Sequence, residues 1–244
     1  MSEDEEVGFI QSVSTLASVE RDGNVLQTLV NFQDYGSKYH PGQLEEEIIS
    51  SRTVWPQGLN APYITGGITI SGADPLFQHR FLTAFLGKMQ HHHIPIALDT
   101  TLLSSKPVMD RLMDKIDLWM VSLKYMDNLR FKGLIGEPLA NVLENILYLD
   151  YRISQSDLKA SRIRIKFVLV PNVNDDDLNV GLLGSFATKV KNLDVLEIVP
   201  FSPTEPSQLS QREILTFEGI RAATIRDIVR VRKILKRCDI SIKY

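Results

Sequence analysis

Short apolar runs rich in β-branched residues alternate with longer segments of helical period, and this alternation constrains the fold of the chain most. The apolar runs are NVLQTLVNF, GGITIS, IPIALDT, LWMVSLK, RIRIKFVLV, VLEIVPF and ISIKY. Helical patterns occupy about 43–53, 76–90, 106–115, 137–151, 175–188 and 216–237. Strands that alternate with helices are typical of a parallel sheet with crossover helices. A chain of 244 residues can form such a sheet as one unit, so we predict a single α/β domain over 1–244, with the helices outside the sheet.

Two of the helical segments carry apolar stripes that predict which face packs on the sheet. The segment 137–151 has apolar residues at helical spacing, namely Leu139, Val142, Leu143, Ile146 and Leu147. The last segment has a similar stripe of Ile220, Thr224, Ile228, Val231, Leu235 and Cys238. Free cysteine is commonly buried, so we interpret Cys238 as a core residue.

The opposite side of the last helical segment is basic, with Arg226, Arg230, Lys233 and Arg237 on one face. Such charge runs usually form a solvated surface, and we adopt that interpretation. Docking of an acidic partner is the alternative.

Charge and hydropathy exclude several kinds of partner. A formal net charge of −3 provides no basic field for nucleic acid or an anionic membrane. No apolar run approaches the roughly 18 to 20 residues that span a bilayer, and the acidic start MSEDEE is unlike a signal peptide. We therefore predict a cytoplasmic protein with a disordered acidic tail over 1–7. One cysteine cannot form an internal disulfide, nor can it supply a site that needs several thiolates.

Polar residues follow the predicted strands, where parallel α/β proteins gather their ligands. The Gly72-Ala73 turn would let a ligand approach the backbone, while Asp74 and Asp99 could accept from an amine or hydroxyl and Lys124 could meet a carboxylate. Helix capping and mutual pairing are the plainer interpretation of these side chains. The residues alone leave both alternatives open.

Five ordered segments, GGITISGADPLFQ, IPIALDTT, DLWMVSLKYMD, IKFVLVPNVNDDD and LEIVPFSP, resemble the pyruvate formate-lyase activating enzymes of the radical SAM superfamily. The resemblance runs from about Gly8 to the C-terminus. It implies a partial (β/α)6 TIM-like barrel with outer helices that holds a 4Fe-4S cluster and S-adenosylmethionine (SAM). Enzymes of this family generate a 5′-deoxyadenosyl radical and abstract hydrogen from a glycine of a partner enzyme.

The resemblance also implies a SAM pocket, which this chain keeps only in part. The family's GGEP-like motif falls on Gly72, Ala73, Asp74 and Pro75, and its LDTNG strand end falls on 98–102, keeping Asp99 and Thr100. The lysine of its LDLK motif is Lys124, but Ser122 replaces an aspartate that helps to hold a monovalent cation. Lys166 replaces an arginine and Ser202 a histidine. The predicted vestigial pocket is therefore Gly72, Ala73, Asp74, Asp99, Thr100, Lys124, Lys166 and Ser202.

The decisive departure lies in the stretch NFQDYGSKYHPGQ. Family members carry Cys-x3-Cys-x2-Cys here, and aligning Phe32-Gln33 with the family's motif puts Tyr35, Tyr39 and Gly42 on the three cysteine positions. Iron-sulfur clusters need thiolates or, less often, imidazoles, and these residues supply neither. We therefore predict a degenerate cluster loop over 34–43, no 4Fe-4S cluster and no radical SAM activity.

Histidines do not replace the missing thiolates. His91, His92 and His93 are adjacent, so their side chains point in different directions, and they precede a strand on the side away from the predicted ligand end. One further imidazole near the loop, His40, does not make a site. We predict no metal.

Three hypotheses remain open. The first is a non-catalytic relative that acts as a protein-binding or regulatory module, with a glycyl radical enzyme, an active activase, or a peptide at the open barrel side as partner. The second is a SAM-binding enzyme with polar, non-radical chemistry that uses Asp74, Asp99 and Lys124. The third is a divergent activase, either with a cluster that a partner ligates or with a name given by similarity.

Overall fold

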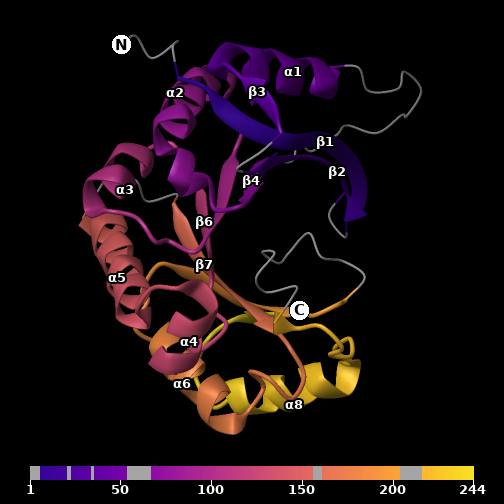
Figure 1. Ribbon diagram of the computed structural model, residues 1–244, viewed down its shortest axis with the longest axis vertical. Coiled ribbons are helices and arrows are strands. Elements are labelled where there is room, and N and C mark those ends of the chain that lie inside the picture. The colour runs from indigo at the N-terminus through magenta and orange to yellow at the C-terminus, as the bar shows by residue number, and fades with distance from the viewer. Residues whose placement is uncertain (1–5, 21–22, 34–35, 54–66, 156–160, 204–215) are drawn as a thin grey trace. The chain divides into compact units, whose positions relative to one another are not determined.

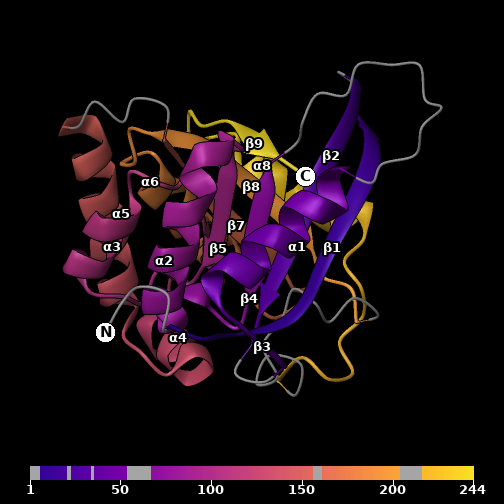
Figure 2. The ribbon, with the colours of Figure 1, turned by 90° about the horizontal axis from the view of Figure 1, so that it is seen from above.

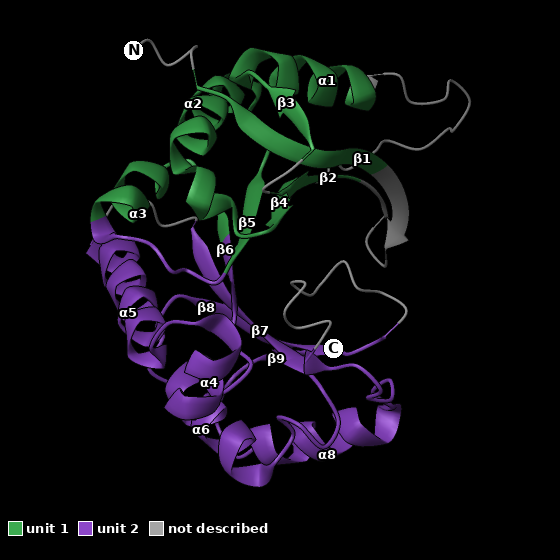
Figure 3. Ribbon diagram, viewed as in Figure 1, with its two compact units in different colours: residues 1–100, 107–118 green, residues 101–106, 119–244 purple. Residues whose placement is uncertain are grey.

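The computed structural model describes residues 6–20, 23–33, 36–53, 67–155, 161–203 and 216–244 (Figure 1). The chain divides into two compact units, one formed by Met1–Thr100 with Pro107–Leu118 and the other by Thr101–Lys106 with Trp119–Tyr244 (Figure 3). Each unit has its own strands and covering helices. The single domain over 1–244 stays a prediction, and most of the expected tail, 1–5, lies outside the described residues.

Unit 1 contains five strands in the order β3-β1-β2-β4-β5. An antiparallel hairpin of β1 (Gly8–Glu20) and β2 (Gly23–Phe32) carries the short β3 (Ser37–Tyr39) on its outer edge. Strands β4 (Ile68–Gly72) and β5 (Ile96–Thr100) follow β2 in parallel. Unit 1 thus joins an antiparallel hairpin to the predicted parallel strands.

The helices of unit 1 cover one face of these strands. They are α1 (Pro41–Thr53), the 3-10 turn η2 (Pro75–Gln78), α2 (His79–Met89), the 3-10 turn η3 (Gln90–His92) and α3 (Lys106–Leu112). Figure 2 shows α1 and α2 on the same side of β4. Alternate residues of β2, including Val30 and Phe32, are buried under them, and the Phe32 and Phe81 rings lie 5.8 Å apart. Because side chains alternate along a strand, the other face of β2 lacks this apolar cover.

Unit 2 has four strands in the order β6-β7-β8-β9, which are β6 (Leu118–Ser122), β7 (Arg162–Leu169), β8 (Leu193–Pro200) and β9 (Ile242–Lys243). Strands β7, β8 and β9 are parallel. The helices are α4 (Asn128–Ile135), α5 (Leu139–Gln155), α6 (Asp177–Ala187) and α8 (Ile225–Leu235). Ile163, Ile165 and Phe167 of β7 are fully buried, as expected for the helix-covered face.

Local capping explains where the unit 2 helices begin. Asp127 and Asp176 accept from the backbone N–H of Arg130 and Asn179, which satisfies first-turn donors of α4 and α6. Thr224 and Asp227 form a capping box that begins α8. The predicted start of this helix at 216 is wrong, because Gly219 has a φ of +76° and the capping box lies farther along the chain.

Several other sequence predictions need correction. Strands β1 and β3 and helix α4 were not predicted, and the loop expected over 34–43 is a strand at 37–39 followed by a helix from 41. Leu147 is 38% exposed, so the α5 stripe continues through Leu149 and Ile153 instead. Thr224 and Ile220 precede α8 and are not part of its stripe.

Cys238 follows the end of α8 and is only partly buried. Its Sγ lies so close to Gly184 of α6 that a Cβ there would be 2.7 Å away. This contact supports the interpretation of Cys238 as a packing residue.

In the part of the chain that the structure describes, no helix is long and apolar enough to span a bilayer.

Candidate functional site

The turn after β4 is held tightly by the neighbouring strand β2. Gly72 has a φ of +114°, and a Cβ built on it would lie 1.9 Å from the Phe32 carbonyl oxygen. The Ala73 N–H donates to the same oxygen at 2.8 Å. The closeness of β2 is therefore sufficient to require glycine here, whether or not a ligand approaches the turn.

Asp74 is the most constrained polar residue of this turn. It is 8% exposed and has a φ of +29°, a conformation that is uncommon for a residue with a side chain. Its Oδ1 accepts from the Thr100 Oγ1 at 2.7 Å and from the Leu76 N–H at 3.2 Å. Asp74 and Thr100, both expected in the SAM pocket, thus lie together, and Asp74 also caps the following turn, η2, while binding of SAM by these residues stays a prediction.

Asp99 and Gln78 extend the hydrogen bonding around the turn. The Ser71 Oγ donates to the Asp99 Oδ2 at 3.1 Å, which joins β4 to β5. The Gln78 side chain accepts from the Phe9 N–H at 2.7 Å and donates to the Phe9 and Gln33 carbonyls at 3.3 and 2.9 Å. Gln78 thus links η2 to the ends of the β1–β2 hairpin.

The face of the unit 1 strands opposite α1 and α2 is largely polar, although Leu29, 38% exposed, also lies on it. Gln27 donates to Thr69 at 2.9 Å, and Asn31 donates to Gln11 at 2.8 Å. Parallel strands that are covered on both faces are usually apolar throughout, so this polar ladder marks a face that the unit 1 helices leave uncovered. We call it the polar face of unit 1, formed by Gln11, Gln27, Asn31, Thr69, Ser71 and Asp99.

In unit 2, the backbone around Lys124 is fixed by two buried asparagines. The Lys124 carbonyl accepts from the Asn174 and Asn179 Nδ2 atoms at 3.2 and 3.3 Å, and Lys124 itself is 7% exposed. The Leu123 N–H donates to the Lys166 carbonyl at 2.9 Å, so Lys124, which follows β6, comes near Lys166 of β7 along the backbone. Ser202 follows β8 and is partly buried.

The face of β7 and β8 opposite the buried Ile163, Ile165 and Phe167 carries charges that the sequence analysis missed. Arg164 lies 2.6 Å from Asp194 and 3.5 Å from Glu197, and Lys243 lies 3.9 Å from Glu197. Lys166 stands opposite Glu197 in the register of β7 and β8. The alternation of charged and apolar residues in RIRIKF was the signal, since every second side chain of a strand shares a face.

The predicted pocket residues are divided between the two units. Gly72, Ala73, Asp74, Asp99 and Thr100 surround the β4 and β5 ends of unit 1, whereas Lys124, Lys166 and Ser202 belong to unit 2. Convergence of the two groups on one ligand stays a prediction.

Comparison with curated proteins finds relatives that are named as activating enzymes. The chain is 29% identical over 142 residues to a pyruvate formate-lyase-activating enzyme of Staphylococcus epidermidis, which covers 56% of this chain and 54% of that protein. It is 32% identical over 146 residues to a 4-hydroxyphenylacetate decarboxylase activating enzyme of Clostridioides difficile, covering 60% and 44%. The matches span about half the length of these relatives. No protein-family model matches the chain.

Solved structures share the fold. A radical SAM methyltransferase from Sphaerobacter thermophilus aligns with a TM-score of 0.67 at 13% identity, covering 100% of this chain and 74% of that one. Streptococcus suis SuiB bound to its precursor peptide SuiA aligns with a TM-score of 0.60 at 13% identity, covering 97% and 46%.

This chain is a relative of the pyruvate formate-lyase activating enzymes. The fold class predicted from the resemblance is confirmed by the structural alignments, and the sequence relatives confirm the resemblance itself.

In this activase relative, the described positions of the cluster ligands do not fit an iron-sulfur cluster. Tyr39 ends β3, and its hydroxyl donates to the Glu47 carboxylate at 2.6 Å. That hydrogen bond raises the pKa of Tyr39 above its ordinary value, which disfavours the phenolate that a metal would need. Gly42 lies in the first turn of α1 and has no side chain. Tyr35 lies outside the described residues.

Other side chains do not take the place of the thiolates. Cys238, the only cysteine of the chain, belongs to unit 2 and packs on Gly184, far along the chain from this segment. His91, His92 and His93 are exposed around η3, where the His92 Nε2 lies 2.8 Å from Glu45. Within the described ranges, no group of three or more His, Cys, Asp or Glu side chains could hold a metal ion.

The turn of this activase relative carries acceptors of the kind that SAM would need, whereas the described part of 34–43 supplies no thiolate. Asp74 and Asp99 supply carboxylate oxygens, which are suitable acceptors for the cofactor's amino and hydroxyl groups. The conformation of Asp74 is strained, and strained residues cluster at ligand sites. Its Oδ1 already serves Thr100 and Leu76, however, so a bound amino group would share this acceptor.

Proposed function

We propose that this chain is a non-catalytic relative of the glycyl-radical-enzyme activases that acts as a protein-binding or regulatory module. In this role the chain keeps the activase fold and has lost radical chemistry. Its partner is a glycyl radical enzyme or an active activase, and the polar faces of the strands receive a polypeptide segment.

One observation carries the proposal. Of the three positions that hold cluster thiolates in activases, the two described here are a phenol hydrogen-bonded to Glu47 and a glycine in a helix. Neither supplies a thiolate, and the single cysteine packs elsewhere. Without a cluster the reductive cleavage of SAM has no electron donor, so the proposed role does not include it.

The polar faces support a polypeptide as the ligand. Extended peptides bind through regularly spaced polar groups, and both units present such groups on strands that the helices leave uncovered on one side. A structural neighbour of this chain, SuiB, is bound to a precursor peptide. This likeness in fold motivates the choice of ligand.

Anaerobic reconstitution with iron and sulfide tests the loss of the cluster. We expect the purified chain to remain colourless and to retain no stoichiometric iron after desalting, whereas an authentic activase treated in parallel turns brown. Broad visible absorption with sulfide bound to the chain would overturn the proposal.

Binding to a purified glycyl radical enzyme from the same organism tests the partner. Gln27 and Thr69 lie on the polar face of unit 1, so Gln27→Arg with Thr69→Arg should weaken binding about tenfold, or about 1.4 kcal/mol. Glu46→Arg on the exposed side of α1 is the control and should have little effect. Absence of binding to both the glycyl radical enzyme and its activase would contradict the partner.

A SAM-binding enzyme with polar chemistry is the second candidate, favoured by the strained and buried Asp74. Calorimetric titration with SAM distinguishes the candidates when Asp74→Ala is compared with Asp114→Ala, an exposed acid of the same unit. Micromolar binding, about −8 kcal/mol, that disappears only in Asp74→Ala would favour this second candidate. No binding would leave protein binding as the function.

A further inference from the structure

The outer side of α8 carries a row of cations that the rest of the described chain does not neutralise. Arg226 and Lys233 lie on this side, Lys236 and Arg237 follow the end of the helix at Leu235, and all four are exposed. None of these four forms an ion pair with any residue in the ranges that the structure describes. We call these four residues the basic row of α8.

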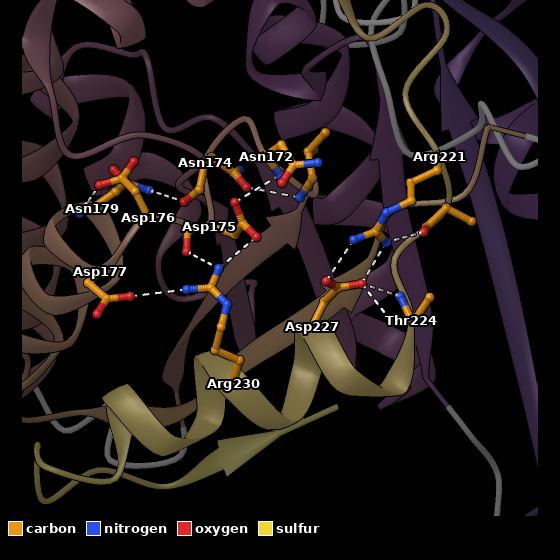
Figure 4. A network of polar contacts seen from close by, with 12 residues as sticks. Asn172, Asn174, Asp175, Asp176, Asp177, Asn179, Arg221, Thr224, Asp227 and Arg230 are labelled. Carbon is orange, nitrogen blue, oxygen red and sulfur yellow. Dashed lines mark hydrogen bonds and ion pairs between the residues drawn. The ribbon is translucent and has the colours of Figure 1, made fainter.

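Other cations near α8 do have partners. Arg230 is on the same helix face as Arg226 and Lys233, but its guanidinium is held by the loop before α6, where it contacts Asp175 and lies 3.0 Å from Asp177 (Figure 4). Arg221 lies 2.7 Å from Asp227, the capping residue of α8 (Figure 4). The acids Asp175, Asp177 and Asp227 thus pair with Arg230 and Arg221 and hold α8 in place. No described acid forms an ion pair with the basic row.

Helix stability does not explain the row. Cations near a helix C-terminus are favourable, which accounts for Lys233, Lys236 and Arg237. Arg226 lies in the first turn, where a cation is unfavourable, and Lys233 and Arg237 are like charges four residues apart. An anionic ligand would relieve this repulsion.

The surrounding charge selects the kind of ligand. Residues 225–237 contain six basic residues and one acidic residue, a net charge of +5, so the remainder of the chain carries −8. A large polyanion such as a DNA duplex or a membrane would meet this negative remainder, whereas a short acidic peptide can lie along α8 alone. Ile225 and Val229 beside the row are 61% and 58% exposed and would accept an apolar side chain of such a peptide.

We propose that the basic row of α8 is a docking surface for an acidic, extended segment of a partner protein. Arg226 and Arg237 are 11 residues apart, about 16 Å along the helix axis. An extended segment spans that distance in about five residues. The surface belongs to unit 2 alone, and the inference does not depend on the loss of radical chemistry or on SAM.

Fluorescence anisotropy with a labelled acidic peptide tests this proposal. The probe alternates Glu with Leu over about ten residues, and a Gln-for-Glu peptide is its control. We expect the full chain to bind the Glu peptide, and we expect this binding to weaken as the salt concentration is raised. The Gln peptide should not bind.

Charge reversal then locates the site. Arg226→Glu, Lys233→Glu and Arg237→Glu together should weaken binding at least about tenfold. The matched control reverses Lys132, Lys189 and Lys191, which are also exposed in unit 2, so it changes the net charge equally and should weaken binding less than about threefold. If the α8 reversal variant fails to fold, the corresponding triple Gln variant should likewise bind the Glu peptide more weakly than the control variant does.

Three outcomes would overturn the proposal. They are no binding of the Glu peptide to the unmodified chain, equal loss in the α8 and control variants, and tighter binding of a DNA duplex or of anionic phosphatidylserine vesicles than of the peptide.

Discussion

Two neighbouring regions of unit 1, the turn 71–78 and the segment 36–43, differ in how firmly their side chains are held. In the turn, Asp74 is buried and hydrogen-bonded, and Gly72 has no space for a side chain. In the segment, Ser37, Lys38 and His40 are exposed and Tyr39 bonds to a surface glutamate. The residues of the turn are required by the packing of the sheet itself. Cluster ligands in the exposed segment are not required by packing, so only function would maintain them.

Gln78 connects the two regions, because its side chain bonds to Phe9 and to Gln33, just before the segment. The framework that positions the segment therefore survives in a chain without the thiolates. Substitutions in the turn 71–78 should therefore lower the free energy of unfolding more than substitutions in the segment 36–43.

The largest effect is expected for Gly72→Ala. The new Cβ would lie 1.9 Å from the Phe32 oxygen at a φ of +114°, so we expect the free energy of unfolding to fall by about 3 kcal/mol or more. Gly87→Ala in α2 is the control, since nothing lies within 4 Å of the place that its new Cβ would occupy, and it should gain up to about 1 kcal/mol. Urea denaturation measures both. A tolerated Gly72→Ala would show that the turn is loose.

Asp74→Ala should cost about 2 kcal/mol, because the buried Thr100 hydroxyl and the Leu76 N–H lose their acceptor. Asp74→Asn keeps an oxygen acceptor and should cost less. The same denaturation experiment compares them, and equal stability of Asp74→Ala and the unmodified chain would mean that this carboxylate is kept for a ligand rather than for the turn.

Gln78→Ala should cost about 1 to 2 kcal/mol, because hydrogen bonds to two backbone segments are lost together. Hydrogen exchange offers the specific measurement, since the Phe9 amide should lose protection. Gln90→Ala, an exposed glutamine of the same unit, should leave that amide unchanged. Unchanged protection of the Phe9 amide in Gln78→Ala would show that Gln78 does not link the turn 71–78 to the segment 36–43.

The smallest effect is expected for Tyr39→Phe, about 0.5 kcal/mol or less at neutral pH. Glu47 raises the folded-state pKa of Tyr39 above its unfolded value near 10. The contribution is therefore present below pH 10 or so and is lost as pH rises through the folded-state pKa. Ultraviolet titration should show that the variant lacks one late-ionising phenol, and an unchanged titration would refute the Glu47 contact.

Much of the fold followed from the sequence because the parallel strands are rich in Ile, Val and Leu. The β1 run GFIQSVSTLASVE escaped prediction because its residues are mixed in polarity and its pairing with β2 is antiparallel. Strand β3 is three residues long, too short for a periodic signal. The early start expected for α8 ignored Gly219 and the capping box.

The SAM site itself stays a prediction. The sequence placed Asp74 and Thr100 after neighbouring strands, but it did not show the contact between Gly72 and β2, since that depends on the closeness of β2. The Arg164, Glu197 and Lys243 group joins three strands and had no motif. Sequence spacing cannot reveal such contacts, because they depend on register between distant segments.

Leu102, after β5, has a φ of +59° and is fully buried, at the position where activases carry the glycine of LDTNG. Its carbonyl accepts from Asn145 of α5, which helps to hold this conformation. A leucine does not favour a left-handed backbone by itself, whereas a glycine does. Burial of the Leu102 side chain and the hydrogen bond from Asn145 therefore hold a backbone conformation that a glycine would adopt without such support.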